Sequence, residues 1–308
     1  MFALDISENR IRVLEIVKKH DHFLLHGMAE GPLAHVDDLP AVLQKLTKEA
    51  KPKPILTEEL AFAIPEEETF IKVVNIPKDE PEMLQAKLLE NISGVLPYAP
   101  EEIYWDWRIV GDGKDQEDHV DAVFVAATKK IVDRYIDLIT QGGFRPLLVE
   151  TEVNALLWGA LNPLFTPADI EPTILVDFGL SKTTMIIFVK GAIRFTTSTK
   201  IVLGDIPRAP GVSPEHMQNP KYLDDLSAQI KECIDYYQEH LMHTHGGAAP
   251  TPITQLLLTG AWSEIGDISA SFGKKLNLTI REQPKILPLT PSYITALGLS
   301  LRAIYEET

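Results

Sequence analysis

The sequence predicts a duplicated α/β protein, in which two related lobes share a cleft and a third α/β lobe is inserted into the first half. Three observations predict it. Residues 3–18 and 175–190 each read as strand, turn and strand, and they align without a gap. The chain of 308 residues is ample for two lobes but long for one undivided core. The stretch between the two hairpins has its own pattern of strands and helices.

The alignment of the two hairpins places Asp5 on Asp177 and Val17 on Val189. In the second hairpin an apolar strand delivers Asp177 and then Gly179 into a polar turn. Glycine lets the backbone approach an oxyanion, successive N–H groups can donate to it, and the aspartate can hold Mg²⁺ directly or through water. The side chains that could also donate are Ser181, Lys182, Thr183 and Thr184. The pattern therefore predicts a phosphate-binding turn, although ordinary hairpins also carry such turns.

Charge and composition limit the classes of partner that this chain is expected to bind. The 29 Lys and Arg against 44 Asp and Glu give a net charge of −15, which argues against nucleic acid or anionic lipid as the main partner. We expect no membrane insertion, because no apolar stretch is long enough to cross a bilayer, and no signal peptide precedes Asp5. The single cysteine, Cys233, fits a reducing cytoplasm and a buried helix position.

The first lobe begins with residues 1–50, where the hairpin, a third strand at 21–28 and a helix from about 40 to 50 form a βββα unit. We expect the inserted lobe at 51–145. Its strands are expected at 60–64, 69–76, 103–110 and 120–127, and its helices at 81–95 and 129–141.

The first lobe continues at 146–170 with a strand at 147–149 and a helix at 152–161. Glu150 stands at the end of that strand. There its carboxylate could face the cleft and orient water or magnesium as a catalytic group, or it could cap the helix that follows. Both interpretations are open.

The second lobe is expected at 171–290, with its hairpin at 173–199, a helix at 226–241, a strand at 253–258 and a helix at 264–276. The strand at 253–258 runs into Gly260, Ala261 and Trp262, and a small residue after a strand can seat an adenosine ring against the backbone. The alternative is that these residues only form a tight connection between the strand and the helix that follows it. Residues 291–308 are expected as a helix that packs back on the first lobe.

Four predicted segments follow one another along the chain: the Asp5 hairpin, the Asp177 hairpin, the glycine turn at 258–261 and a terminal helix with Ala296 to Arg302. This order resembles the actin-like ATPase superfamily, and within it the PilM family of type IV pilus assembly proteins, which is related to the cell-division protein FtsA. Further matching segments are 61–65, 96–98, 106–107, 143–146 and 235–238.

The resemblance implies a ribonuclease-H-like fold with ATP and Mg²⁺ between the lobes. Asp5, Ser7, Asn9, Arg10 and Arg12 would form the first phosphate turn. Asp177, Gly179, Ser181, Lys182, Thr183 and Thr184 would form the second, and Gly260, Ala261 and Trp262 the adenosine turn. Asp5 and Asp177 would lie at the magnesium ion.

The resemblance also implies a partner, the N-terminal cytoplasmic tail of a PilN-like inner-membrane protein, held in a groove between the first lobe and the inserted lobe. The protein would then be cytoplasmic and peripheral at the inner membrane through that partner. Self-association is left open.

The nucleotide turns depart from the family pattern. Ser7 replaces a glycine, Glu8 places a negative charge near a polyphosphate, and Ala261 replaces a second glycine. Three functions are therefore considered: an ATP-binding scaffold that is at most a slow ATPase, a pseudo-ATPase interaction module of the same machinery, and a small-molecule kinase of the same superfamily. The third depends on Glu150 alone.

Overall fold

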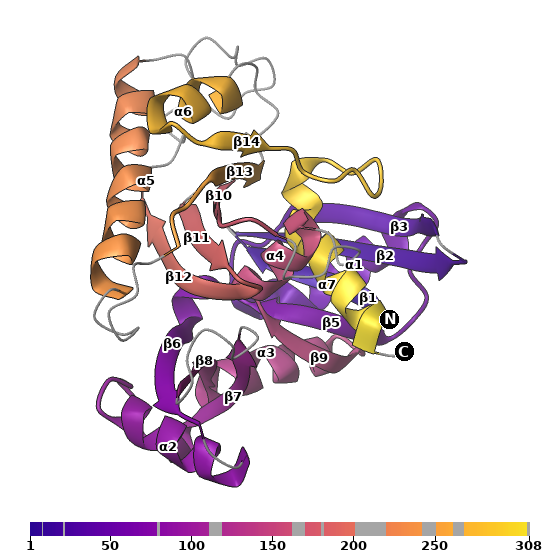
Figure 1. Cartoon of the computed structure of the whole chain (residues 1–308). Coiled ribbons are helices and arrows are strands. Elements are labelled where there is room, and N and C mark those ends of the chain that lie inside the picture. The colour runs from indigo at the N-terminus through magenta and orange to yellow at the C-terminus, as the bar shows by residue number, and fades with distance from the viewer. Residues whose placement is uncertain are drawn as a thin grey trace.

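The computed structural model shows two sheets on either side of a helical layer, with a smaller lobe attached below (Figure 1). It describes residues 1–7, 9–20, 22–78, 81–110, 119–161, 170–179, 182–200, 220–241, 251–260 and 268–306. Within that part of the chain no helix is long and apolar enough to span a membrane.

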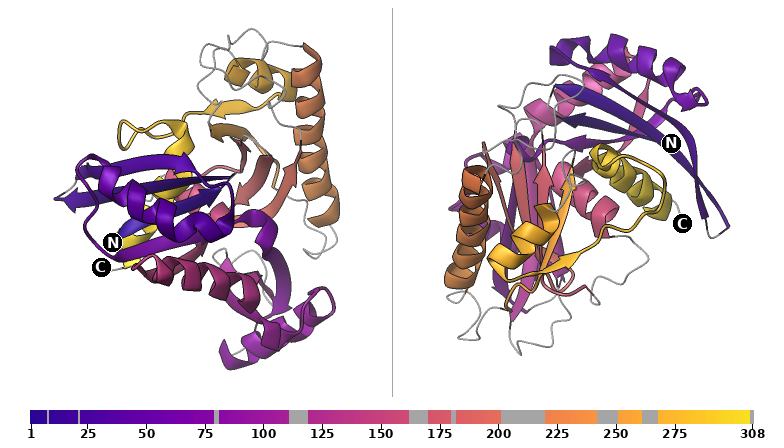
Figure 2. Two further views of the ribbon diagram at one scale, coloured as in Figure 1. Left: turned by 180° about the vertical axis from the view of Figure 1, so that it is seen from behind. Right: turned by 90° about the horizontal axis from the view of Figure 1, so that it is seen from above.

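The first lobe is built on a six-stranded sheet in the order β4-β3-β2-β1-β5-β9. Its strands are β1 (Phe2–Ser7), β2 (Arg10–Lys19), β3 (His22–Pro32), β4 (Lys51–Pro52), β5 (Glu59–Ile64) and β9 (Arg145–Thr151). Helices α1 (Leu39–Glu49) and α3 (Lys129–Gln141) cover its outer face, as the view from behind shows (Figure 2). The large buried residues Phe2, Leu4 and Phe62 point to this face.

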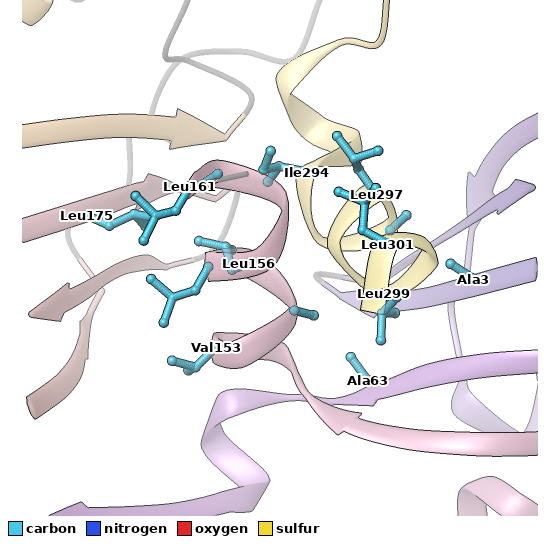
Figure 3. Close-up of a cluster of buried hydrophobic side chains, with 14 of the residues drawn as sticks. Ala3, Ala63, Val153, Leu156, Leu161, Leu175, Ile294, Leu297, Leu299 and Leu301 are labelled. Atoms are coloured by element: carbon cyan, nitrogen blue, oxygen red, sulfur yellow. The ribbon is translucent and has the colours of Figure 1, made fainter. Parts of the chain in front are cut away.

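The inner face of the same sheet carries small residues, including Ala3, Ala61 and Ala63, where α4 (Glu152–Leu161) and α7 (Ile294–Glu306) pack against it (Figure 3). Small side chains let the two helices approach closely. At the crossing of α4 and α7, a Cβ added to Gly298 would collide with the carbonyl oxygen of Ala155. The expected return of the terminal helix to the first lobe is what the structure has.

The second lobe has a five-stranded sheet in the order β12-β11-β10-β13-β14. Its strands are β10 (Thr173–Phe178), β11 (Thr183–Val189), β12 (Ala192–Thr199), β13 (Gln255–Gly260) and β14 (Thr279–Arg281). Helices α5 (Pro220–Leu241) and α6 (Ile268–Leu276) cover one face, where Cys233 is buried as expected. Leu175, Ile186 and Leu257 on the other face join the core around α4.

The expected duplication is confirmed by strand pairing. β1 pairs antiparallel with β2 and parallel with β5, and β10 pairs in the same way with β11 and β13. Asp5 lies opposite Arg12 in the first hairpin, and Asp177 lies opposite Thr184 in the second. The two aspartates therefore occupy equivalent positions in the two lobes.

The inserted lobe is a three-stranded sheet in the order β6-β8-β7, covered by α2 (Pro81–Ser93). Its strands are β6 (Thr69–Pro77), β7 (Ile103–Val110) and β8 (His119–Thr128). Short 3-10 helices occupy Val36–Asp38, Glu66–Glu68, Pro100–Glu102 and Pro291–Tyr293.

Three elements differ from the expected division at residues 51 and 145. β4 pairs with β3, so it belongs to the first lobe. β5 pairs with β1 and β9, and α3 packs Val132, Leu138 and Ile139 into the core of the first lobe. Both therefore belong to the first lobe, and the inserted sheet begins at Thr69. Periodicity alone identified these elements but not the sheet that each joins, because that choice depends on long-range pairing.

One helix of the second lobe starts earlier than expected. α5 begins at Pro220 rather than at residue 226, and proline is favoured at the first position of a helix. Residues 201–219, which precede this helix, lie outside the described residues, as does the expected start of α6 at residue 264.

Candidate functional site

The two hairpins and the end of β13 meet at one small cavity between the lobes, which we call the interlobe cavity. Seven residues predicted for the nucleotide site line it: Asp5, Ser7, Arg12, Asp177, Gly179, Lys182 and Gly260. Its volume is about 30 Å³, enough for roughly two water molecules. The two-lobe geometry expected from the duplication is therefore present at this point.

In the first turn a buried ion pair fills the position in front of the Asp5 carboxylate. Arg12 Nη1 lies 3.1 Å from Asp5 Oδ2 and donates to Ser7 Oγ at 3.1 Å. Glu30 lies 3.4 Å from Arg12 Nε on the other side. Burial raises the pKa of Asp5 to about 6, against the opposing effect of Arg12, and the nearby Glu152 adds to the rise. Arg12 is thus engaged by carboxylates of this chain.

In the second turn Lys182 gathers three carboxylates of the first lobe, a group we call the Lys182 cluster. Its Nζ lies 2.9 Å from Glu67, 3.0 Å from Glu152 and 4.0 Å from Glu66. Burial acts to lower the pKa of Lys182, but the charge of Glu152 and the bonds to Glu67 outweigh burial, so this pKa is raised. The lysine remains charged and ties the second lobe to the first.

The glycines of the second and third turns also use their backbone locally. Gly179 N–H donates to the carbonyl of Lys182 at 3.0 Å, which closes the hairpin. Gly260 has φ +85°, and a Cβ there would lie 2.5 Å from the Phe178 carbonyl oxygen and 2.7 Å from Asp177 Oδ1. A glycine is needed at this position, because the strand ends pack too closely for any side chain.

Several predicted residues lie elsewhere. Asn9 forms the hairpin turn with φ 59°, and Arg10 pairs with Glu30 at 3.2 Å, away from the cavity. Thr183 and Thr184 are buried, and Thr184 Oγ1 lies 3.3 Å from Ser198 Oγ. The predicted residues Ser181, Ala261 and Trp262 lie outside the described residues, as does Glu8.

Glu150, the predicted catalytic residue, does not line the interlobe cavity. Its carboxylate accepts from Asn154 Nδ2 at 2.7 Å and from its neighbour's backbone, Thr151 N–H, at 2.8 Å. The carboxylate that reaches the cavity is Glu152, in the first turn of α4. Sequence reasoning missed Glu152, together with Ser292 and Thr295 at the start of the terminal helix. The sequence signal that could have identified Glu152 is the start of α4 directly after β9. The first turn of a helix that begins at a strand end points toward the cleft.

MgATP does not fit the interlobe cavity as the described residues line it. Nucleotide-sized ligands occupy pockets of roughly 300 Å³ or more, about ten times the volume present. The two cations that could meet phosphates, Arg12 and Lys182, are held by carboxylates. Among the described residues no group of three or more His, Cys, Asp or Glu is arranged to hold a metal ion.

A much larger hollow, which we call the side groove, lies between the first lobe and the inserted lobe. Its volume is about 520 Å³. It is lined by residues 104–108 of β7, Val123 and residues 125–127 of β8, residues 148–151 of β9, Val132 and Ile136 of α3, and Ile64, Thr69, Asn154, Ile193 and Arg302. Its walls are mainly apolar, with aliphatic and aromatic side chains, and the carboxylates Glu150 and Asp106 are matched in number by Arg302 and Arg108.

The inserted lobe is also joined to the second lobe. Arg194 of β12 forms an ion pair with Asp121 of β8, and both side chains are largely buried. Ser198 Oγ donates to Glu66 at 2.6 Å just before β6 begins. The first contact joins the inserted sheet to the second lobe, and the second joins the first lobe to it.

A family model described as type IV pilus assembly protein PilM matches residues 3–202. The chain belongs to the PilM family. The match covers the whole first lobe up to α4, the inserted lobe and the second hairpin. No curated protein sequence matches the chain.

Solved structures are similar to the chain in fold. A PilM–PilN type IV pilus biogenesis complex is similar with a TM-score of 0.73 at 14% identity, covering 98% of both chains. The cytoplasmic domain of EpsL, an inner-membrane component of the Vibrio cholerae type II secretion system, gives 0.52 at 10% identity over 98% of this chain and 94% of that one. MreB5 of Spiroplasma citri bound to AMPPNP gives 0.53 at 10% identity over 99% and 97%. The PilM-family chain therefore has the actin-like ATPase fold.

Proposed function

We propose that this PilM-family chain is an interaction scaffold for assembly of a type IV pilus or a related secretion machine. In this proposal it holds the N-terminal cytoplasmic tail of a PilN-like membrane protein in the side groove and needs no nucleotide to do so. The contrast between the two hollows carries the proposal: about 520 Å³ is open at the side groove and about 30 Å³ at the interlobe cavity.

The character of the side groove supports a peptide ligand. Val149 is 41% exposed and lies beside Val132 and Ile136, so apolar surface is left uncovered at the sheet edge. An extended peptide can cover such surface with alternate side chains while its backbone bonds to polar groups along the walls. The similar PilM–PilN complex supports a PilN-like protein as the source of that peptide. The chain would then be cytoplasmic and held at the inner membrane by its partner.

The Lys182 cluster supports independence from nucleotide. It joins the lobes by charge contacts at the position where the two phosphate turns face each other. A polyphosphate entering there would have to break these contacts and approach Glu152 and Asp5. The lobes are already held together without a ligand.

A second candidate is the ATP-regulated scaffold. The observation in its favour is that Asp5, Asp177 and Gly260 line one cavity in the equivalent positions of the two lobes. In this case the cavity would open when MgATP binds, and the Lys182 cluster would exchange its carboxylates for phosphates.

Calorimetric titration separates the two candidates. The parent protein is titrated with a synthetic peptide of the PilN-like tail, with and without MgATP, and separately with MgATP alone. We expect peptide binding that is the same in both conditions and no heat of binding from MgATP. Binding of MgATP by the parent that is lost in Asp177→Ala would establish the second candidate. Absence of peptide binding in either condition would refute the scaffold proposal.

A further inference from the structure

The side groove runs along the free edges of two sheets. Side chains of successive residues in a strand point to opposite faces, so a hollow lined by several in succession lies beside the strand's edge. Residues 148–151 of β9 and residues 104–108 of β7 line the groove in this way. The groove therefore has one strand edge from the first lobe and one from the inserted lobe.

Both edges offer backbone groups. In the described sheets β9 pairs only with β5, and β7 pairs only with β8. Pro146 lies in β9. Within sheets, proline is confined to edge strands, to the first residue of a strand or to bulges. The β5–β9 pairing has an irregularity between Leu60 and Ala61, and such irregularities gather at sheet edges and binding sites.

Local carboxylates cover one N–H at each edge. Glu150 accepts from Thr151 N–H at 2.8 Å, and Asp106 accepts from Trp107 N–H at 2.8 Å. A carboxylate that satisfies its neighbour's N–H protects an edge from unwanted pairing. It can also swing aside when a carbonyl of an added strand takes its place. The rest of the β9 edge, at Leu148 and Val149, is flanked by apolar side chains.

From this geometry we infer that the partner's tail binds as an added β-strand, paired through its backbone with the free edge of β9 in the side groove. This inference rests on the proposed function. Residues 148–151 of β9 line the groove, so the paired part of the added strand is about four residues long, or roughly 13 Å. Its alternate side chains are apolar, one set meeting Val132 and Ile136 and the other meeting Leu148 and Ile193.

The test is an N-methyl scan of the tail peptide. Each backbone N–H in the bound segment is replaced in turn by N–CH₃, with side chains unchanged, and affinity for the parent protein is measured by calorimetry. In an added strand only alternate N–H groups face the neighbouring strand. We expect losses of at least about tenfold at alternate positions and less than about threefold at those between, since each loss leaves a backbone acceptor unpaired.

The outcomes are distinguishable. If the unmodified tail does not bind, the proposed function fails. If it binds but the methyl scan shows no period of two, the scaffold function stands and strand addition is overturned. If a period of two appears, amide hydrogen exchange identifies the edge: we expect slowed exchange at Val149, which has the same strand parity as Thr151. Protection confined to β7 would overturn the assignment to β9.

Discussion

The ammonium of Lys182 in the second lobe lies 3.0 Å from the carboxylate of Glu152 in the first, at the point where the two duplicated hairpins face each other. Glu67 lies 2.9 Å from the same ammonium and Glu66 lies 4.0 Å from it. Lys182 thus links the two lobes across the interlobe cavity, in addition to the core that both sheets share around α4. Residues of this chain therefore join the two lobes at the interlobe cavity.

The Lys182 cluster should contribute measurably to stability. Lys182→Met leaves Glu152 and Glu67 without their cation, at a site where the lysine side chain is 12% exposed. We expect a loss on the order of 2 kcal/mol in the free energy of unfolding, between the values typical of exposed and of buried pairs. Urea denaturation measures it. Lys45→Met, on the exposed side of α1, is the matched control and should change stability by less than about 0.5 kcal/mol.

A double-mutant cycle assigns the effect to the pair. Glu152→Gln alone should cost less than Lys182→Met, because Glu67 still holds the lysine. The double variant should lose less than the two single losses added together. Strict additivity would show that Lys182 and Glu152 do not interact in solution.

Asp5 should make the fold less stable as pH rises. Burial raises its pKa to about 6 in the folded protein, above the value near 4 of an unfolded chain. Such a carboxyl stabilises the fold below pH 4, and this contribution is lost as the pH rises through about 6. Asp5→Asn removes the ionisation. We therefore expect the variant to match the parent near pH 4 and to exceed it by about 2–3 kcal/mol at pH 7.

Urea denaturation of Asp5→Asn and the parent at several pH values checks this prediction. Asp225→Asn on the exposed side of α5 is the control and should show no such dependence. An Asp5→Asn protein that is less stable than the parent at pH 7 would mean that the pair with Arg12 outweighs burial, and the prediction would be wrong.

Gly260 and Gly143 form a matched pair for the turn after β13. Both have positive φ, +85° and +83°, so an alanine costs about 1 kcal/mol in backbone strain at either position. A Cβ on Gly143 meets nothing within 4 Å, whereas one on Gly260 lies 2.5 Å from the Phe178 carbonyl oxygen. We expect Gly260→Ala to cost roughly 2 kcal/mol more than Gly143→Ala in thermal or urea unfolding. Equal costs would show that the strand ends at the cavity separate easily.

Val149 tests the side groove as the peptide site. An aspartate in its place puts a charge on the apolar wall beside Val132, and binding of the tail peptide would have to desolvate it. We expect affinity to fall by at least about tenfold, roughly 1.4 kcal/mol, in calorimetry. Leu24→Asp is the control, since Leu24 is 50% exposed on β3 and does not line the groove. A tail that binds both variants equally well would lie elsewhere.

The chain's own residues determine most of the secondary structure. Strands and helices are predicted close to their observed positions because their patterns are local: an apolar run before the turn in β1 and β10, helical spacing in α3, and glycine or proline at several ends. The duplication was also readable, since Asp5 and Asp177 follow equivalent strands. The first lobe's use of β5 and α3 was not, because pairing partners far apart in sequence leave no mark on local periodicity.

Tertiary structure decided what occupies the site. The sequence by itself predicts that Asp5, Asp177 and Gly260 lie at one site. Each stands near the end of a strand, and the parallel strands of a lobe end at the same edge of its sheet. Only packing decided that Arg12 lies on Asp5 and that Lys182 reaches Glu152 and Glu67. Only packing turned Glu150 toward the side groove and brought Glu152 to the cavity. Side-chain direction and charge pairing depend on neighbours from distant segments, and these become neighbours only when the lobes close.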